Sequence, residues 1–295
     1  AGGRHQISAG GDVIRFQLNG TESNNSRGQF QFGNNFGRTA IDNLRWGTPN
    51  MFEGSVGDLN RGYRNWMLNG YVADRWKVST RLQITLGLRY MLDSRPKEIH
   101  EKEQLPYQTD SNNFSPRFAV AWQAGKGWVA RAMYTTTFGQ ILPVTYQQIR
   151  YNPPNVYYLM VPDPNLVNPL GGMVIGPGTR YSPIWISPDL ATPYSHQYNA
   201  GLERKLVAGS VLRVSYLGSR SFKLLNMYSM NRAVPVAGVP LTTGTVDQRR
   251  GDSRYSDTKT VVNAGIAYYD AGQVLWDLPL RRGMMFSMGY TFSKA

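Results

Sequence analysis

One stretch of the chain reads Arg81-Leu82-Gln83-Ile84-Thr85-Leu86-Gly87-Leu88-Arg89-Tyr90-Met91-Leu92, in which apolar residues alternate with mostly polar ones. A period of two is that of a β-strand, whose successive side chains point to opposite faces. At about 3.3 Å per residue the stretch spans ~40 Å, and a tilt of about 45° gives a rise of ~28 Å, close to the hydrocarbon thickness of a bilayer. Strands in soluble sheets are usually half as long, so the stretch predicts a membrane-crossing strand.

The same alternation recurs along most of the chain. It is clear in residues 114–122 and 284–294 and weaker in 5–17 and 27–33, and the other candidate strands are 66–77, 127–138, 194–206, 209–220 and 264–280. About ten strands and no convincing helix are therefore predicted. The predicted fold is all-β. Because the strands are long enough to cross a bilayer, we expect an antiparallel transmembrane β-barrel, and about ten strands would be an incomplete part of a larger barrel.

The connections between these candidate strands alternate in length. Short links are expected at 78–80, around Gly125-Lys126, at Val207-Ala208 and around Arg281-Arg282-Gly283, and long ones at 34–65, 93–113, 139–193 and 221–263. Outer-membrane barrels have this layout, with short periplasmic turns and long extracellular loops. Only the link at 18–27 is longer than the alternation predicts. Ten of the 17 prolines lie within 143–193, which predicts an irregular loop there.

The composition excludes several classes of protein. A hydrophobic content of 41% is enough to build a folded domain, but the longest apolar run, residues 156–161, is far too short for a membrane-spanning helix. The chain has no cysteine, which rules out disulfides, thiolate zinc sites and thiol nucleophiles. Its formal net charge of +13 is spread along the sequence without a nucleic-acid-binding motif, so no nucleic acid is expected as a partner.

Several motifs follow one another in an order typical of one family. The first is a hairpin formed by Asn69-Gly70-Tyr71-Val72-Ala73-Asp74-Arg75-Trp76-Lys77-Val78 and Leu86-Gly87-Leu88-Arg89-Tyr90. Four shorter motifs follow it along the chain: Asn113-Phe114-Ser115-Pro116-Arg117, Thr192-Pro193-Tyr194-Ser195, Tyr216-Leu217-Gly218-Ser219-Arg220 and Gly289-Tyr290-Thr291-Phe292-Ser293-Lys294. In this order they resemble the barrel of Oar-like TonB-dependent transporters. Each motif alone is weak, but the shared order makes the match specific. Ala73, where that family often has Gln, and the strongly basic balance are departures from it.

The resemblance implies energy-coupled import of a ligand across the outer membrane of a Gram-negative bacterium. It also implies a larger barrel that is filled by an N-terminal plug and linked through a TonB box to the inner membrane. Plug, TonB box and signal peptide are not recognisable in the sequence, and we expect residues 1–295 to be part of a barrel domain, cut at both ends. The expected partners are outer-membrane lipid, the plug, the TonB complex reached through it, and an imported ligand whose identity the sequence does not reveal.

No catalytic, cofactor or metal site is predicted. The three histidines, His5, His100 and His196, do not have the spacing of metal ligands. Ser195 and His196 are neighbours on a candidate strand, so their side chains point to opposite faces and cannot form a nucleophile-base pair. We therefore expect the protein not to be an enzyme and to need no cofactor.

The period of two assigns the candidate functional residues to faces of the sheet. The residues expected to face lipid are Leu82, Ile84, Leu86, Leu88, Phe286 and Met288. Tryptophans near strand ends are expected to form the aromatic girdles of the two membrane interfaces: Trp66, Trp76, Trp122, Trp128 and Trp276. Basic residues expected to face the lumen, where a plug or a solute would pair with them, are Arg89, Arg117, Arg131 and Arg213.

Two other functions stay open from the sequence. A structural or adhesive surface barrel would use the long loops to bind partners and would transport nothing. A soluble β-sandwich binding module would use the same alternation to build a core between two sheets, and the tryptophans would then be core residues. A membrane barrel needs detergent for its extraction, whereas a sandwich does not.

Overall fold

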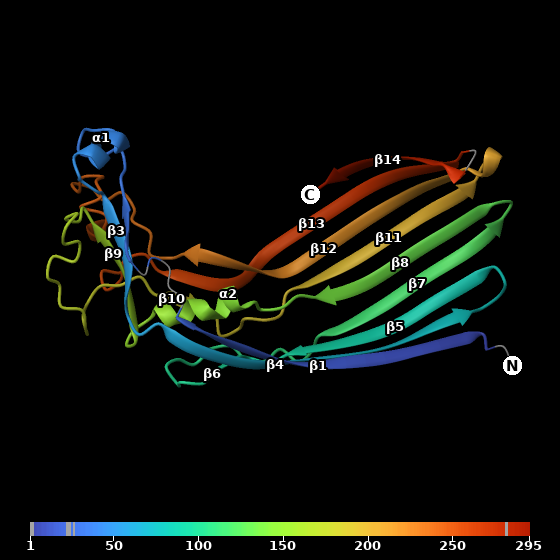
Figure 1. Cartoon of the computed structure of the whole chain (residues 1–295), viewed down its shortest axis with the longest axis horizontal. Coiled ribbons are helices and arrows are strands. Elements are labelled where there is room, and N and C mark those ends of the chain that lie inside the picture. Colours follow the sequence, from blue (N-terminus) through green and yellow to red (C-terminus); the bar gives the residue numbers. More distant parts are fainter. Residues whose placement is uncertain (1–2, 22–24, 26, 281–282) are drawn as a thin grey trace.

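The wall of the molecule is one curved antiparallel sheet. In the computed structural model, which describes residues 3–21, 25, 27–280 and 283–295, nine long strands form this wall. They are β1 (His5–Thr21), β4 (Asn60–Lys77), β5 (Leu82–Asp93), β7 (Phe114–Gly125), β8 (Trp128–Phe138), β11 (Tyr194–Lys205), β12 (Val211–Ser229), β13 (Lys259–Pro279) and β14 (Met285–Lys294). In this order, each strand pairs antiparallel with the next (Figure 1), so the predicted all-β antiparallel fold is confirmed.

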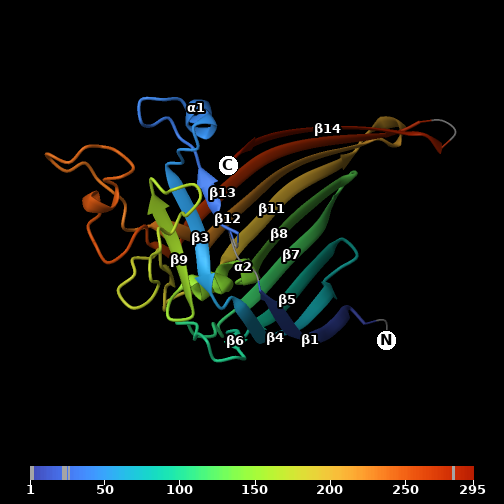
Figure 2. The same cartoon turned by 60° about the vertical axis from the view of Figure 1, so that its left-hand side comes forward.

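The sheet is open along two edges. Within the part of the chain that the structure describes, β1 pairs only with β4, and β14 pairs only with β13. Figure 2 shows these two edge strands on opposite sides of the trough that the wall forms. The wall is thus an incomplete barrel, as predicted.

The wall strands are joined by short turns at one end and long connections at the other. Short turns follow β4, β7 and β11, and long connections occupy 94–113, 139–193 and 230–258. The expected short link around Arg281-Arg282 lies outside the described residues. The prediction of a wall strand at 27–33 was wrong. Only Gln29–Gln31 (β2) is extended there, and it pairs with β3 (Met51–Gly57) outside the wall. Phe30 of β2 packs against Phe52 of β3, with ring centroids 5.1 Å apart.

This correction restores the alternation of the connections. Because β1 pairs directly with β4, everything between Thr21 and Asn60 belongs to one long connection. The link at 18–27 was therefore no exception: residues up to Thr21 belong to the strand, and the rest belong to the first long connection.

The long connections contain more regular structure than the sequence predicted. They hold the helices α1 (Ala40–Arg45) and α2 (Pro143–Tyr146), the 3-10 turns η1 (Gln147–Tyr151) and η3 (Asp247–Arg249), and the short strands β6 (Lys97–Glu98), β9 (Val156–Pro162) and β10 (Ile184–Ile186). The proline-rich segment is thus not irregular throughout: β9 pairs with β3, and β10 adds in parallel to β13. Among the described residues, no helix is both long enough and apolar enough to cross a membrane.

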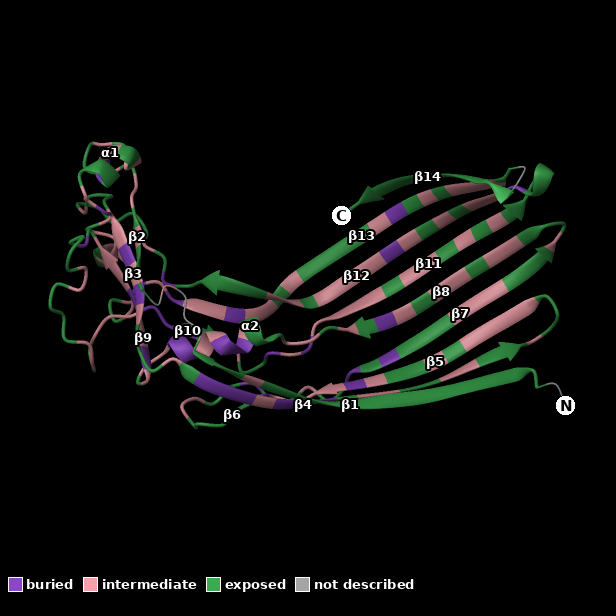
Figure 3. Ribbon diagram, in the orientation of Figure 1, coloured by how far each residue is buried: buried purple, intermediate pink, exposed green. Residues whose placement is uncertain are grey.

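Most of the buried side chains lie at the loop end of the molecule, and the wall is mainly exposed or half-buried on both faces (Figure 3). The main hydrophobic cluster joins the ends of β4 and β13 to the long connections 94–113 and 139–193 and consists of Tyr63, Leu105, Tyr107, Tyr146, Ile186, Leu190 and Val261. A second cluster joins Tyr151, Val156 and Ile184. The long connections therefore pack into a common body instead of extending separately from the strands.

The alternation of the connections gives a test of topology. In the full-length protein on intact cells, we expect Val167→Cys to react with a membrane-impermeant maleimide, because Val167 is 93% exposed in a long connection. Val207→Cys lies 86% exposed in a short turn and is expected to react only after lysis. The chain has no cysteine of its own, so each signal reports one site of this segment. Labelling of Val207→Cys from outside, with Val167→Cys protected, would invert the barrel.

Candidate functional site

The two faces of the wall differ in chemistry. Cross-strand pairs share a face, and one row of pairs joins Leu82, Trp122, Ala130, Leu202, Val214, Val274 and Tyr290. We call the face that carries this row the convex face. It also carries the remaining residues predicted to face lipid, Ile84, Leu86, Leu88, Phe286 and Met288, since each occupies an equivalent position of the alternation.

The predicted girdle tryptophans all lie on this convex face. Trp128 and Trp276 belong to one cross-strand row with Arg204 and Leu212, and the Arg204 guanidinium lies 4.7 Å from the centre of the Trp128 ring. Trp76 stacks on His5 with ring centroids 5.4 Å apart, near the short-turn end of β4. Trp66 lies ten residues earlier on the same strand.

A second aromatic row lies ten residues from the Trp128 row, toward the loops. It consists of Phe138, Tyr194 and Phe222, which are direct cross-strand partners on β8, β11 and β12, with ring centroids 5.8 Å and 5.5 Å apart. This row was not predicted from the sequence, where only tryptophans were assigned to the girdles. The spacing between Trp66 and Trp76 was the signal that would have found it, since the same interval separates Phe138 from Trp128.

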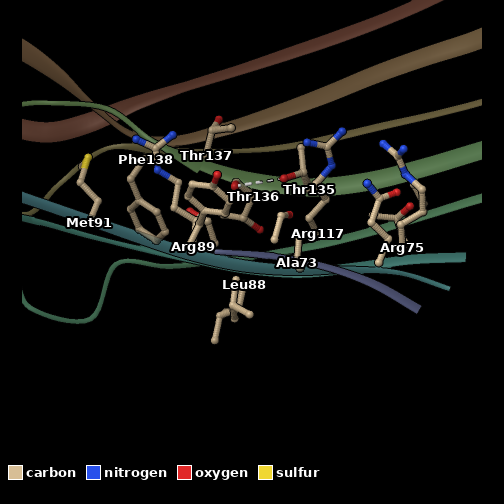
Figure 4. A pocket seen from close by; sticks show the side chains of 18 of the residues that line it. Ala73, Arg75, Leu88, Arg89, Met91, Arg117, Thr135, Thr136, Thr137 and Phe138 are labelled. Atoms are coloured by element: carbon tan, nitrogen blue, oxygen red, sulfur yellow. Dashed lines mark hydrogen bonds between the residues drawn. The ribbon is translucent and has the colours of Figure 1, made fainter. Parts of the chain in front are cut away.

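The concave face is polar. A groove of about 760 Å³ runs along it between β1 and β8 and is lined by Arg75, Gln83, Thr85, Arg89, Ser115, Arg117, Thr135 and Thr137, among others. Figure 4 shows Arg89 and Arg117 on the groove side of the sheet, and Leu88 projecting on the other side. The groove is therefore built by the residues that alternate with the apolar row.

The four basic residues predicted to face the lumen all lie on the concave face, but they have different partners. Arg89 donates to Asn69 Oδ1 at 3.0 Å, and Arg117 approaches the Met133 sulfur at 4.0 Å. Arg213 instead forms ion pairs with Glu203, at 3.0 Å, and with Asp277, near the short turns. Among the described acidic residues, none forms an ion pair with Arg75, Arg89, Arg117 or Arg131.

A buried ion pair ties the loop body to the wall. The Arg61 Nε atom lies 3.0 Å from Glu103 Oε2, and the two side chains are 2% and 8% exposed. Tyr63 donates to the other oxygen of the same carboxylate, and Arg61 also donates to the backbone carbonyl of Asp58 at 2.7 Å. Burial raises the pKa of the Glu103 carboxyl, although the hydrogen bond and the charge of Arg61 lower it.

Polar contacts also join the long connections to one another. Arg180 pairs with Asp247 at 3.0 Å, and Thr243 donates to Asp163 at 2.6 Å, so these side chains link the connections 139–193 and 230–258. Lys102 pairs with Asp58 at 2.6 Å, and this hydrogen bond holds the pKa of the Asp58 carboxyl below its usual range. Across the described residues, no group of three or more histidine or acidic side chains is arranged to hold a metal ion.

The sequence matches the family described as "Outer membrane beta barrel domain" over residues 1–105 and 101–295. The chain belongs to this outer membrane beta barrel domain family. It is therefore a protein of the bacterial outer membrane, and its convex apolar face and open antiparallel wall are those of a barrel segment. No curated protein matches the sequence.

Solved outer-membrane structures share the fold of this barrel segment. The outer membrane transporter YddB of Escherichia coli is 17% identical with a TM-score of 0.55, and covers 100% of this chain and 32% of its own. The siderophore receptor PirA of Acinetobacter baumannii is 13% identical with a TM-score of 0.55, and the ferric enterobactin receptor PfeA of Pseudomonas aeruginosa is 14% identical with a TM-score of 0.54. Each match covers 98% of this chain, together with 34% of the PirA chain and 33% of the PfeA chain. The chain thus spans about a third of the length of the structures it matches.

The difference between the two faces can be measured with arginine. Leu86→Arg places a charge on the convex face, near the middle of β5, and we expect it to cost about 2–4 kcal/mol of stability in a bilayer. Gln197→Arg places the same charge on the concave face, between the uncharged partners Thr135 and Ser219, and we expect little cost. Denaturant unfolding of the full-length protein in vesicles measures both. Equal penalties at the two positions would contradict the assignment of the faces.

The buried ion pair predicts a strong effect in the loop body. Glu103→Ala leaves the Arg61 guanidinium buried and unpaired, and we expect local unfolding to become easier by about 3–5 kcal/mol. Cleavage of the loops by protease on intact cells should then accelerate sharply. Asp58→Ala is the control, because it breaks a pair whose carboxylate is exposed and should leave the cleavage rate unchanged. Equal cleavage of the two variants would mean that the buried pair does not hold the loops together.

Proposed function

We propose that this barrel segment is part of the wall and the extracellular loops of a TonB-dependent transporter of the Oar-like kind. Such a protein would import a ligand across the outer membrane with energy supplied through TonB. The observation that best supports this proposal is the pairing of the transporter-like fold with a concave face that holds arginines without carboxylate partners. The ordered family motifs in the sequence support the Oar-like kind.

The convex residues are proposed to contact lipid. Leu82, Ile84, Leu86, Leu88, Phe286 and Met288 would lie in the apolar band, and Trp66, Trp76, Trp122, Trp128 and Trp276 in its aromatic girdles. The ten-residue interval between Trp66 and Trp76 supports this assignment. At about 3.3 Å per residue and a tilt of ~45°, it corresponds to a height of ~23 Å, close to the ~25 Å band of outer-membrane barrels.

The concave arginines are proposed to contact a plug from the same polypeptide. Arg75, Arg89, Arg117 and Arg131 project from neighbouring strands into one polar face, and none of them forms an ion pair with a described carboxylate. Cations in this arrangement favour an acidic surface or an anionic solute. Arg213 is already paired twice within the wall, so its proposed role is to hold β11, β12 and β13 together rather than to bind a plug.

The alternatives have less support. A soluble sandwich would need a second sheet over the convex face, yet in the described chain that face remains exposed along the wall. A structural or adhesive barrel would share the wall and the loops but would have no plug against the concave face. A test of the plug therefore separates this alternative from the transporter.

Two neighbouring residues on β8 allow such a test. Thr135 lines the concave groove, whereas Tyr134 lies on the convex face. A photocrosslinking amino acid placed at Thr135 in the full-length protein, in intact cells, is expected to link to a segment of the same polypeptide outside residues 1–295. The same amino acid at Tyr134 is expected to give no such product.

The readout is mass spectrometry of the cross-linked peptides. Lack of the internal product at Thr135, in a protein that is folded and inserted, would favour the adhesive or structural barrel. The same internal product at Tyr134 would mean that the faces have been exchanged.

A further inference from the structure

Strand β12 contains a bulge where it passes the second aromatic row. Its register with β13 shifts between Ser221 and Leu224, and Lys223 has a φ of 55°, a conformation that a lysine rarely adopts. The bulge is held in place by Asn263, whose side-chain amide donates to the Lys223 carbonyl at 2.7 Å and to the Ala191 carbonyl at 2.8 Å. A strained lysine that the surrounding structure fixes so firmly points to a function of its side chain.

The bulge lies at the edge of the apolar band. Phe222 is ten residues from Leu212, which belongs to the Trp128 row. At about 3.3 Å per residue and a tilt of ~45°, the two are ~23 Å apart in height, against an apolar band of ~25 Å. With the long connections outside the cell, Lys223 is at the level of the outer-leaflet head groups.

Lys223 opens onto a groove on the convex face. The groove has a volume of about 470 Å³ and is lined by Phe114, Tyr134, Phe138, Tyr194 and His196 as well as Lys223. The His196 ring is held by two hydroxyl groups: its Nδ1 atom lies 2.8 Å from the Tyr134 hydroxyl and 3.1 Å from Thr136 Oγ1. Rings with polar tips beside an exposed cation are suited to the boundary between acyl chains and head groups.

The charges around the groove leave Lys223 available. The carboxylate of Asp110, which also lines the groove, accepts the backbone N–H groups of Thr192 at 3.0 Å and of Asn112 at 3.4 Å. Arg220, on the same strand, is paired with both oxygens of Asp270 at 2.9 Å. Lys223 is exposed, and no described carboxylate forms an ion pair with it.

We propose that this groove binds the phosphate-bearing head group of an outer-leaflet lipid, with the Lys223 ammonium on the phosphate and the acyl chains along the convex face below it. The Lys223 charge suits a phosphate, and its height at the band edge supports a lipid rather than a soluble anion as the occupant. The inference goes beyond the transport function and depends only on the orientation of the barrel in the membrane.

Lys223→Gly separates binding from folding, because glycine adopts a positive φ without strain and removes only the side chain. The full-length protein in detergent is titrated with a bisphosphorylated lipid A, its dephosphorylated form and free pyrophosphate, and bound lipid is read by native mass spectrometry. We expect Lys223→Gly to bind the phosphorylated lipid about fivefold more weakly, without a lower unfolding temperature. Lys223→Arg should keep the affinity within about twofold.

Lys126→Gly is the matched control, since Lys126 also has a positive φ, 48°, but lies in a short turn at the other end of the wall. It should bind the lipid as tightly as the unmodified protein. Equal affinity of Lys223→Gly and the unmodified protein would overturn the proposal. So would equal binding of the dephosphorylated lipid, or of free pyrophosphate, and so would a loss of affinity that appears only together with unfolding.

Discussion

Inside a bilayer, a peptide N–H or C=O group without a partner finds no water, and each such group costs several kcal/mol. The wall meets this constraint with long ladders in continuous register, such as the one that joins all 17 residues of β1 to β4 without a shift. A slip by one residue would move every side chain to the other face. The hydrogen-bond register therefore fixes which residues meet lipid and which line the groove, and the chemistry of both faces depends on it.

The same constraint explains why the molecule has its core at one end. Side chains of the wall alternate between two environments, so they cannot pack against one another in the interior of a protein. The long connections, together with the ends of β4 and β13, build a dry interior around residues such as Tyr63, Tyr146 and Ile186. The buried pair between Arg61 and Glu103 lies beside this interior and joins the wall to it. The loops consequently form one body at the end of the strands.

An element of this fold could be predicted from the sequence where a local sequence pattern determines it, and not where contacts between distant residues do. The wall strands and their turns follow from a local period of two. Eight of the nine wall strands correspond to candidates in the sequence, and the ninth, β1, corresponds to the weaker candidate 5–17. The segment 27–33 carries the same period but is too short, and its partner β3 was not recognised. β9 was missed because its apolar run has no alternation and is bounded by prolines. Arg61 and Glu103 are 42 residues apart, and no local pattern connects them.

The arginines of the wall fall into two groups, those that form ion pairs within the sheet and those that do not. Arg213 and Arg220 each have carboxylate partners on neighbouring strands, so their charges are used within the sheet. Arg89 and Arg117 contact uncharged groups, the Asn69 amide and the Met133 sulfur, and form no ion pair among the described residues, although they lie on a face that the barrel would enclose. Cations gathered in an enclosed space repel one another and attract negative charge. An acidic surface inside the barrel would relieve that repulsion, which is why the concave face is better explained as half of an interface than as a bare channel wall.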